Sequence, residues 1–214
     1  MKQEFITRAG KERLTILFAG WGMDPAPFEA YASEGSDLMI CYDYGDMSFD
    51  ATVLDGYRSA HIAGWSMGVW AADRTSSEIR LPAKYTAING TPWPLDEKRG
   101  IPPAVFYGTL EALSDSSIGK FRRRMCGDAD TLLRFSKTLP NRSIESLRTE
   151  LSAIADAAAG YNPAVGLWDE AYVGSRDLIF PAANQKEAWR QIGCMVKTVD
   201  AAHYSEKIFE EVLL

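Results

Sequence analysis

Residues that form disulfides and metal sites are scarce in this sequence of 214 residues, which has three cysteines and two histidines. Cys41, Cys126 and Cys194 are too far apart for a CxxC metal site and are odd in number, so we expect reduced thiols. Glycine-rich phosphate motifs of the G-x-G-x-x-G and G-x-x-x-x-G-K types are absent from the sequence. The sequence therefore predicts no cofactor and no metal.

Long apolar runs are also missing. No stretch approaches the length of a membrane span, and Met1–Phe5 has no apolar core of signal-peptide length. We therefore expect a cytoplasmic protein with no membrane contact. The net charge of −6 argues against nucleic-acid binding. The length and the 46% share of hydrophobic residues are typical of one soluble domain spanning residues 1–214.

The basic residues are unevenly distributed along this acidic chain. From Ile118 to Arg148 there are eight basic residues and three acidic ones. Arg122, Arg123 and Arg124 are consecutive, so they cannot all lie on one face of a helix. The segment is either a solvated helix face with scattered ion pairs or a surface that attracts an acidic partner.

Short apolar runs alternate with helical patterns along most of the chain. We expect strands at residues 14–19, 38–42, 59–64, 85–89, 171–173 and 195–199, and helices at 67–74, 182–191 and 206–213. This alternation predicts an α/β fold with a mostly parallel sheet flanked by helices. Between residues 94 and 163 the pattern becomes helical, near 104–113, 118–125, 129–139 and 144–159. We interpret residues 94–163 as a helical lid inserted between two strands.

Residues 64–68 read Gly-Trp-Ser-Met-Gly and match the G-x-S-x-G motif of a nucleophile elbow. In that motif a sharp turn between strand and helix exposes the serine, and small residues on either side let the two elements pass. A predicted strand precedes Ser66 and a predicted helix follows it, as the elbow requires. Ser66 is therefore the candidate nucleophile; the alternative is an ordinary strand-to-helix turn with glycines for tight packing.

The two histidines allow the general base to be chosen by elimination. His61 lies five residues before Ser66 on the same predicted strand, roughly 16 Å away at about 3.3 Å per residue. It is better explained as a structural histidine. His203 follows the last predicted strand and would reach the same edge of the sheet as Ser66, which makes it the candidate base.

An acid should lie between serine and histidine in the sequence, after a strand. Asp177 fits this position in the turn after residues 171–173, and it would orient the imidazole of His203. Asp200 is the alternative, because it also lies near the end of a strand. The other alternative is that Asp177 is a solvated carboxylate in a turn, without a catalytic role.

The first predicted strand runs into Gly20-Trp21-Gly22. An oxyanion hole needs one backbone N–H from this loop and one from the residue after the nucleophile. Trp21 and Met67 occupy these positions. Without the other motifs, a glycine turn with a core tryptophan would explain the same residues.

With these motifs in this order, the chain resembles the α/β-hydrolase superfamily, with its leading strands reduced to about 4–7. More narrowly, it resembles the compact BioG-type pimeloyl-acyl-carrier-protein methyl ester esterases of biotin synthesis. The narrower resemblance rests on residues 18–23, 64–68, 88–92 and 121–127. It implies hydrolysis of the methyl ester of pimeloyl-acyl-carrier protein at Ser66, with release of methanol.

The resemblance also implies that the acidic acyl carrier protein is the partner of the basic lid, through Arg122, Arg123 and Arg124. It implies an apolar acyl channel, for which plausible walls are Trp21, Trp65, Trp70, Phe106, Leu132, Leu133 and Phe135. Most residues of this kind simply form the core, so they are not assigned as ligand contacts. A thioesterase or broad short-chain esterase with the same triad remains an alternative, as does a binding protein on a hydrolase scaffold.

Overall fold

Seven strands form one sheet in the order β1-β3-β2-β4-β5-β6-β7 in the computed structural model, which describes residues 1–214. The strands are β1 (Lys2–Thr7), β2 (Arg13–Phe18), β3 (Asp37–Tyr42), β4 (Ser59–Trp65), β5 (Ala83–Ile88), β6 (Glu170–Gly174) and β7 (Met195–Val199). The α-helices are α1 (Met67–Thr75), α2 (Pro103–Glu111), α3 (Asp115–Cys126), α4 (Ala129–Phe135), α5 (Ile144–Ala158), α6 (Ala182–Ile192) and α7 (Glu206–Leu213). Short 3-10 helices span Ala26–Tyr31, Ala51–Leu54, Ser76–Glu78 and Ser136–Thr138.

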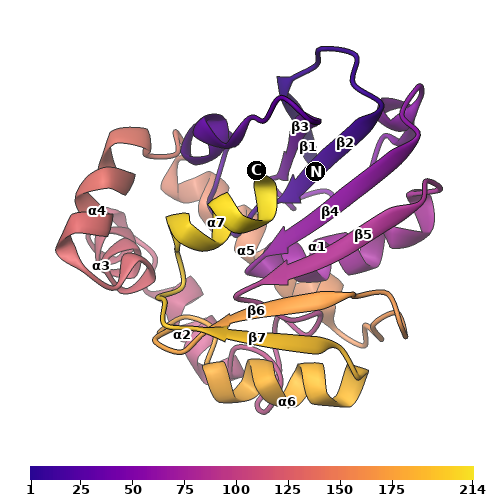
Figure 1. Ribbon diagram of the computed structural model, residues 1–214. Helices are drawn as coiled ribbons and strands as arrows, with labels where there is room; N and C mark the ends of the chain where they lie inside the picture. Colours follow the sequence, from indigo (N-terminus) through magenta and orange to yellow (C-terminus); the bar gives the residue numbers. More distant parts are fainter.

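The sheet is parallel from β3 to β7, and β1 alone runs antiparallel, against β3. All six residues of β3 and five of the six residues of β2 are buried, as expected for strands covered on both faces. In Figure 1, α7 lies in front of the sheet and α1 lies behind it. The predicted α/β class with a mostly parallel sheet is therefore confirmed. No helix has the combination of length and apolar character that a bilayer crossing requires.

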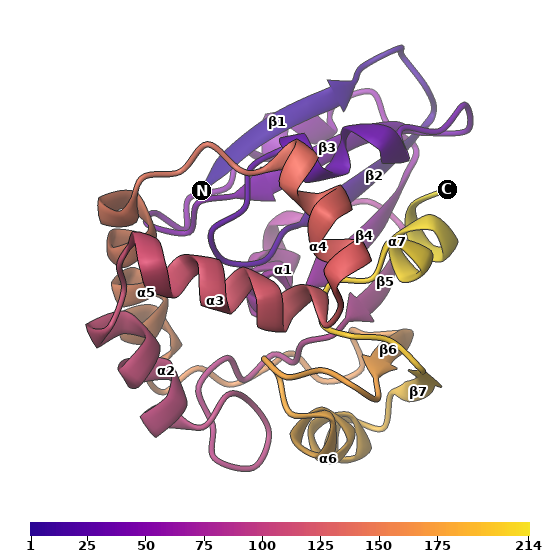
Figure 2. The same cartoon turned by 90° about the vertical axis from the view of Figure 1, so that its left-hand side faces the viewer.

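Parallel pairing brings the carboxyl ends of β2 and β4–β7 to one edge of the sheet. The loops after these strands carry all the candidate catalytic residues. Four helices, α2–α5, lie between β5 and β6 in the sequence. Figure 2 shows α3 and α4 in front of the strand ends, so this helical insertion covers the edge where the candidate residues meet.

The helical insertion is attached to the sheet unevenly. Helix α5 buries five residues, Leu147, Glu150, Leu151, Ile154 and Ala155. In contrast, α2 buries only Phe106 and α4 only Phe135. The helix expected at 129–139 is shorter than predicted, because the α-helix ends at Phe135 and a 3-10 turn follows. The insertion thus has one firmly packed helix, α5, and a more exposed outer part.

Candidate active site

The turn between β4 and α1 has the geometry of a nucleophile elbow. Ser66 has φ 59° and ψ −125°, a strained conformation for a residue with a side chain. There is no room for a side chain at either glycine of the motif. A Cβ on Gly64 would lie 2.7 Å from Val69 Cα, and a Cβ on Gly68 would lie 1.9 Å from the carbonyl oxygen of Phe18. The sharp turn is possible only because both positions lack a side chain, and it places Ser66 at the edge of the sheet, where it lines a cavity.

Ser66, His203 and Asp177 form a continuous chain of hydrogen bonds. Ser66 Oγ lies 2.9 Å from His203 Nε2, and His203 Nδ1 lies 2.8 Å from Asp177 Oδ2. All three residues are buried, with His203 only 1% exposed. The ring of Phe180 stacks on the imidazole at a centroid distance of 6.3 Å. The arrangement lets His203 accept the serine proton while Asp177 fixes the orientation of the imidazole.

The Asp177 carboxylate is held on both oxygens. Oδ1 accepts hydrogen bonds from the backbone N–H groups of Ile179 and Phe180 at 2.8 and 2.9 Å. Oδ2 accepts from Gln185 Nε2 at 3.0 Å as well as from His203. Gln185 is fully buried, and its Oε1 has no hydrogen-bond partner. The sequence analysis missed Gln185, because a glutamine within a helix gives no local signal of a contact with a carboxylate eight residues earlier.

Asn89, directly after β5, joins the loops that carry the acid and the base. Its Nδ2 donates to the carbonyl oxygens of Ala202 and His203 at 2.9 and 2.8 Å, and its Oδ1 accepts from Gly174 N at 2.6 Å. It has φ 44°, a left-handed conformation that asparagine tolerates better than most residues. The sequence analysis used Asn89 only as a mark of family resemblance and missed this contact.

The loop after β2 approaches Ser66 closely enough to supply an oxyanion donor. A Cβ on Gly20 would lie 3.1 Å from Ser66 Cβ. The backbone amides of Trp21 and Met67 donate no hydrogen bond within the chain. Both residues line the cavity that contains Ser66. The amides predicted to form the oxyanion hole are therefore unpaired and close to the nucleophile.

An apolar cavity lies over Ser66 and His203, between the sheet edge and the helical insertion. Ten of its 15 lining residues are hydrophobic. Trp21, Trp65 and Phe106 are among them, as the sequence analysis expected. Arg124, from α3, contributes the one lining side chain with a permanent charge. The cavity thus suits an apolar substrate that has a polar or charged group near one end.

Several other candidate cavity walls lie elsewhere. Trp70 is fully buried in the core, and Leu133 is 62% exposed. Leu132 and Phe135 also do not line the cavity over Ser66. Trp70, on α1, and Phe135, on α4, are core residues, as the alternative explanation held, whereas Leu132 and Leu133 line a separate groove on α4.

The rival candidates for base and acid lie outside the hydrogen-bonded chain. His61 Nε2 contacts Thr86 Oγ1 at 3.0 Å inside the sheet, and burial lowers the pKa of His61 to about 4. Asp200 forms an exposed ion pair with Arg176, at 2.6 Å, and does not contact His203. The chain contains no cluster of three or more histidine, cysteine, aspartate or glutamate side chains that could hold a metal ion.

Comparison with known proteins identifies the family. The family model described as pimeloyl-ACP methyl esterase BioG matches residues 1–212. The chain belongs to the BioG family. A BioG crystal structure from Haemophilus influenzae is 38% identical, with a TM-score of 0.88 and complete coverage of both chains. The predicted resemblance to BioG-type esterases is confirmed. The family is described as one of methyl esterases, which agrees with the expected carboxylic ester hydrolase.

The chain is also similar to a longer protein in sequence and to a carboxylesterase in structure. Malonyl-[acyl-carrier protein] O-methyltransferase of Bacteroides fragilis is 45% identical over 204 residues, which are 95% of this chain. The chain spans 41% of the length of that relative. A carboxylesterase structure from Nitrososphaera gargenis has a TM-score of 0.65 at 12% identity and covers 98% of this chain and 88% of its own. At that identity the likeness concerns the fold alone, which is the α/β-hydrolase fold.

Proposed function

We propose that the chain is a serine carboxylesterase that hydrolyses the methyl ester of pimeloyl-acyl-carrier protein, giving pimeloyl-acyl-carrier protein and methanol for biotin synthesis. The observation that carries the proposal is the hydrogen-bonded chain of Ser66, His203 and Asp177, which opens into an apolar cavity. The match of the BioG family model to residues 1–212 supports the choice of substrate.

In the first half of the reaction Ser66 Oγ attacks the carbonyl carbon of the methyl ester. His203 Nε2, at 2.9 Å, takes the serine proton as the new bond forms. The amides of Trp21 and Met67 stabilise the negative charge on the carbonyl oxygen. The tetrahedral intermediate then expels methoxide, which receives the proton from His203 and leaves as methanol. The product of this half is an ester between Ser66 and the pimeloyl group.

In the second half water attacks the acyl group on Ser66. His203 takes a proton from this water and returns it to Ser66 Oγ when the acyl bond breaks. Asp177 Oδ2, 2.8 Å from His203 Nδ1, stabilises the imidazolium in both halves. The carrier protein stays attached through its thioester throughout. The acylated Ser66 is therefore a covalent link between this chain and the carrier protein.

We further propose that α3 supplies the docking surface for the carrier protein, in the cytoplasm. Arg124 lines the cavity over Ser66, whereas Arg122 and Arg123 line a groove on the other side of α3. Two other arginines of this region have acidic partners: Arg134 pairs with Glu206, and Arg142 with Asp43 and Glu150. The three consecutive arginines have none. The name of the Bacteroides fragilis relative includes acyl-carrier protein, which supports a carrier as the partner.

The proposal is tested by incubating the purified protein with the methyl ester of pimeloyl-acyl-carrier protein and following the mass of the carrier species. The Ser66→Ala variant is the control. We expect the parent protein alone to reduce the carrier mass by the difference between a methyl ester and an acid. A loss of the whole acyl group would instead make the protein a thioesterase. An unchanged carrier, with activity retained on p-nitrophenyl butyrate, would refute the substrate and leave the role of Ser66 intact.

A further inference from the structure

A short segment of the helical insertion holds the loop that carries Trp21. The segment spans residues 141–150 and includes the start of α5. It forms a polar contact with each of four consecutive loop residues: Trp21 Nε1 donates to Leu147 O at 2.9 Å, Gly22 N to Glu150 Oε2 at 3.3 Å, Arg142 Nη1 to Met23 O at 3.0 Å, and Asn141 N to Asp24 Oδ2 at 2.7 Å. The insertion therefore fixes the oxyanion loop in addition to covering the active site.

Glu150 is the most deeply buried charged side chain of this contact. The residue is 1% exposed and lies on the inner face of α5. Besides Gly22 N, it accepts a hydrogen bond from Tyr44 N at 3.1 Å through Oε1. Tyr44 in turn donates its hydroxyl to the carbonyl oxygen of Ala19 at 2.7 Å. One carboxylate thus holds the loop after β2 directly, through Gly22, and indirectly, through Tyr44.

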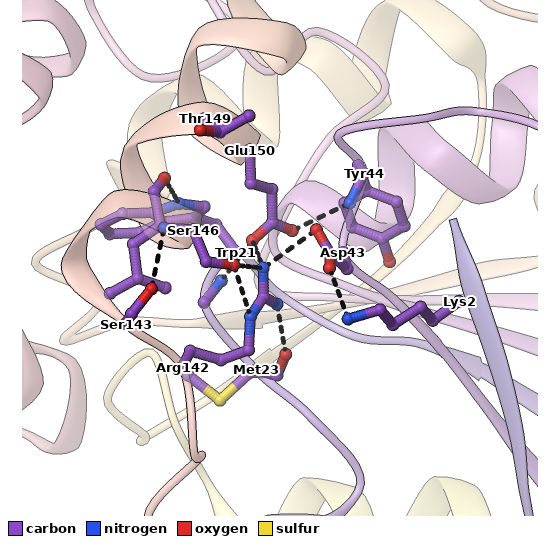
Figure 3. A network of polar contacts seen from close by, with 12 residues as sticks. Lys2, Trp21, Met23, Asp43, Tyr44, Arg142, Ser143, Ser146, Thr149 and Glu150 are labelled. Carbon is purple, nitrogen blue, oxygen red and sulfur yellow. Dashed lines mark hydrogen bonds and ion pairs between the residues drawn. The ribbon is translucent and has the colours of Figure 1, made fainter.

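The charge of Glu150 is balanced by a row of alternating charges (Figure 3). Arg142 Nη2 lies 3.2 Å from Glu150 Oε2 and 2.9 Å from Asp43 Oδ1, and its side chain is 5% exposed. Lys2 Nζ pairs with the other oxygen of Asp43 at 3.0 Å. Buried charges are tolerated when they are paired and hydrogen-bonded in this way. The positive charge of Arg142 partly offsets the cost of burying Glu150, and each carboxylate oxygen accepts one backbone hydrogen bond.

Contacts of the Trp21 indole and of the following amide limit the rotation of the Trp21 backbone. The indole is held by Leu147 O, and the following amide, Gly22 N–H, is held by Glu150. Gly22 has φ 78°, and a Cβ at this position would lie 3.0 Å from Leu147 Cδ2. With its own indole and the following amide held, the Trp21 backbone has little freedom to turn its N–H. Oxyanion donors are effective only when they are held in place before the charge develops.

We propose that Glu150 is a positioning residue for the oxyanion site, which orients the Trp21 amide toward the tetrahedral intermediate on Ser66. The inference rests on the proposed serine esterase function. Glu150 does not touch the substrate or the reacting atoms, and it acts through Gly22 and Tyr44.

The test measures hydrolysis of p-nitrophenyl butyrate by Glu150→Gln and by the parent. The matched control is Asp156→Asn, because Asp156 is an exposed acid on the same helix. Glutamine keeps the shape of the side chain, but its Nε2 is a donor. Only one of the two backbone amides, of Gly22 and Tyr44, can therefore still donate to residue 150. We expect kcat to fall about 100-fold, the effect of losing one oxyanion donor, with KM within twofold. Asp156→Asn should match the parent in both constants.

A second measurement separates positioning from a merely structural role. A trifluoromethyl ketone bonds to the serine and forms a tetrahedral oxyanion, whereas pimelate occupies the cavity without forming one. In Glu150→Gln the inhibition constant of the ketone should rise about as much as kcat falls, while that of pimelate should stay the same. A variant with lowered thermal stability but parental kcat and ketone affinity would overturn the proposal.

Glu150→Asp decides the question if the glutamine variant does not fold. Aspartate keeps the charge that faces Arg142, but its shorter side chain draws the carboxylate away from Gly22 N. Parental ketone affinity in this variant would also overturn the proposal. A parent protein that hydrolyses neither the chromogenic ester nor the carrier-bound methyl ester would instead refute the proposed function, so the two failures are distinguishable.

Discussion

Replacing Asp177 with asparagine should disable the base without disturbing the fold. Asp177 Oδ1 accepts from two backbone N–H groups, of Ile179 and Phe180, so the asparagine oxygen must stay on that side. Its NH₂ group then faces His203 Nδ1. His203 must present Nδ1 as an acceptor and carry its proton on Nε2, which points at Ser66 Oγ. In this tautomer the imidazole cannot take the serine proton.

The size of the expected effect follows from this change of tautomer. An asparagine that reverses the tautomer of a triad histidine lowers kcat by about 10⁴, which corresponds to about 5.5 kcal/mol of transition-state stabilisation. The two backbone hydrogen bonds to Oδ1 keep the loop in place. The new NH₂ group faces Gln185 Nε2, which cannot turn away without losing its hydrogen bond to Phe180 O at 2.8 Å. The free energy of unfolding should therefore fall by about 1–3 kcal/mol, which leaves the protein folded.

The assay is steady-state hydrolysis of p-nitrophenyl butyrate, with urea unfolding of the same preparations. Asp200→Asn is the matched control, because Asp200 lies near the same loop but pairs with Arg176 in an exposed position. It should keep the parental kcat. An Asp177→Asn variant within tenfold of the parent would refute the reasoning, as would a larger loss in Asp200→Asn. Nitrogen-15 shifts of His203 would report the tautomer directly.

Three further predictions concern stability, docking and pH. Asn89→Ala removes the side-chain partners of the Ala202 carbonyl and the Gly174 amide, whereas His203 O keeps its hydrogen bond from Trp65 Nε1. The change should lower the free energy of unfolding, measured in urea, by about 3 kcal/mol. Arg123→Glu should reduce kcat/KM for the carrier-bound ester at least about tenfold at low salt and leave p-nitrophenyl butyrate hydrolysis unchanged; Arg80→Glu, an exposed control outside the insertion, should alter neither. Burial raises the pKa of Glu150 to about 7 from 4.5, against the opposing charge of Arg142. The stability that its protonated form contributes is therefore complete below pH 4.5 and lost as the pH rises through 7. We therefore measure the free energy of unfolding at pH 4.5 and at pH 8. Between these two pH values the parent should lose about 3 kcal/mol more than Glu150→Gln loses.

Local patterns in the sequence were sufficient to predict most of the sheet. The strand expected at 38–42 is β3 (Asp37–Tyr42), and that at 195–199 is β7 (Met195–Val199). The continuous apolar run of β3 fits a strand covered on both faces, whereas the edge strand β7 includes polar residues and has no fully buried position. The antiparallel pairing of β1 with β3 was not predicted, because pairing between strands far apart in the sequence leaves no local pattern.

The candidate site was predictable where a motif fixes the backbone and not where distant side chains meet. Ser66 and His203 follow from a five-residue motif and from the scarcity of histidine. The choice between Asp177 and Asp200 needed the structure, since both follow strands and only Asp177 contacts His203. Glu150 had no sequence signal at all, because its partners Gly22 and Tyr44 are more than 100 residues away.

The tightness of the cavity over Ser66 has a consequence for turnover. Its free volume is about 30 Å³, enough for about two water molecules, whereas pockets for small ligands span about 300–1,000 Å³. If the proposed substrate is correct, its pimeloyl chain should enter only when the walls separate. Helix α5 is held by the oxyanion loop, so the displacement falls on α2 and α3. Motion of helices against solvent is slowed by friction. The rate of substrate capture should therefore fall in viscous sucrose solutions, even though the chemical step does not depend on viscosity.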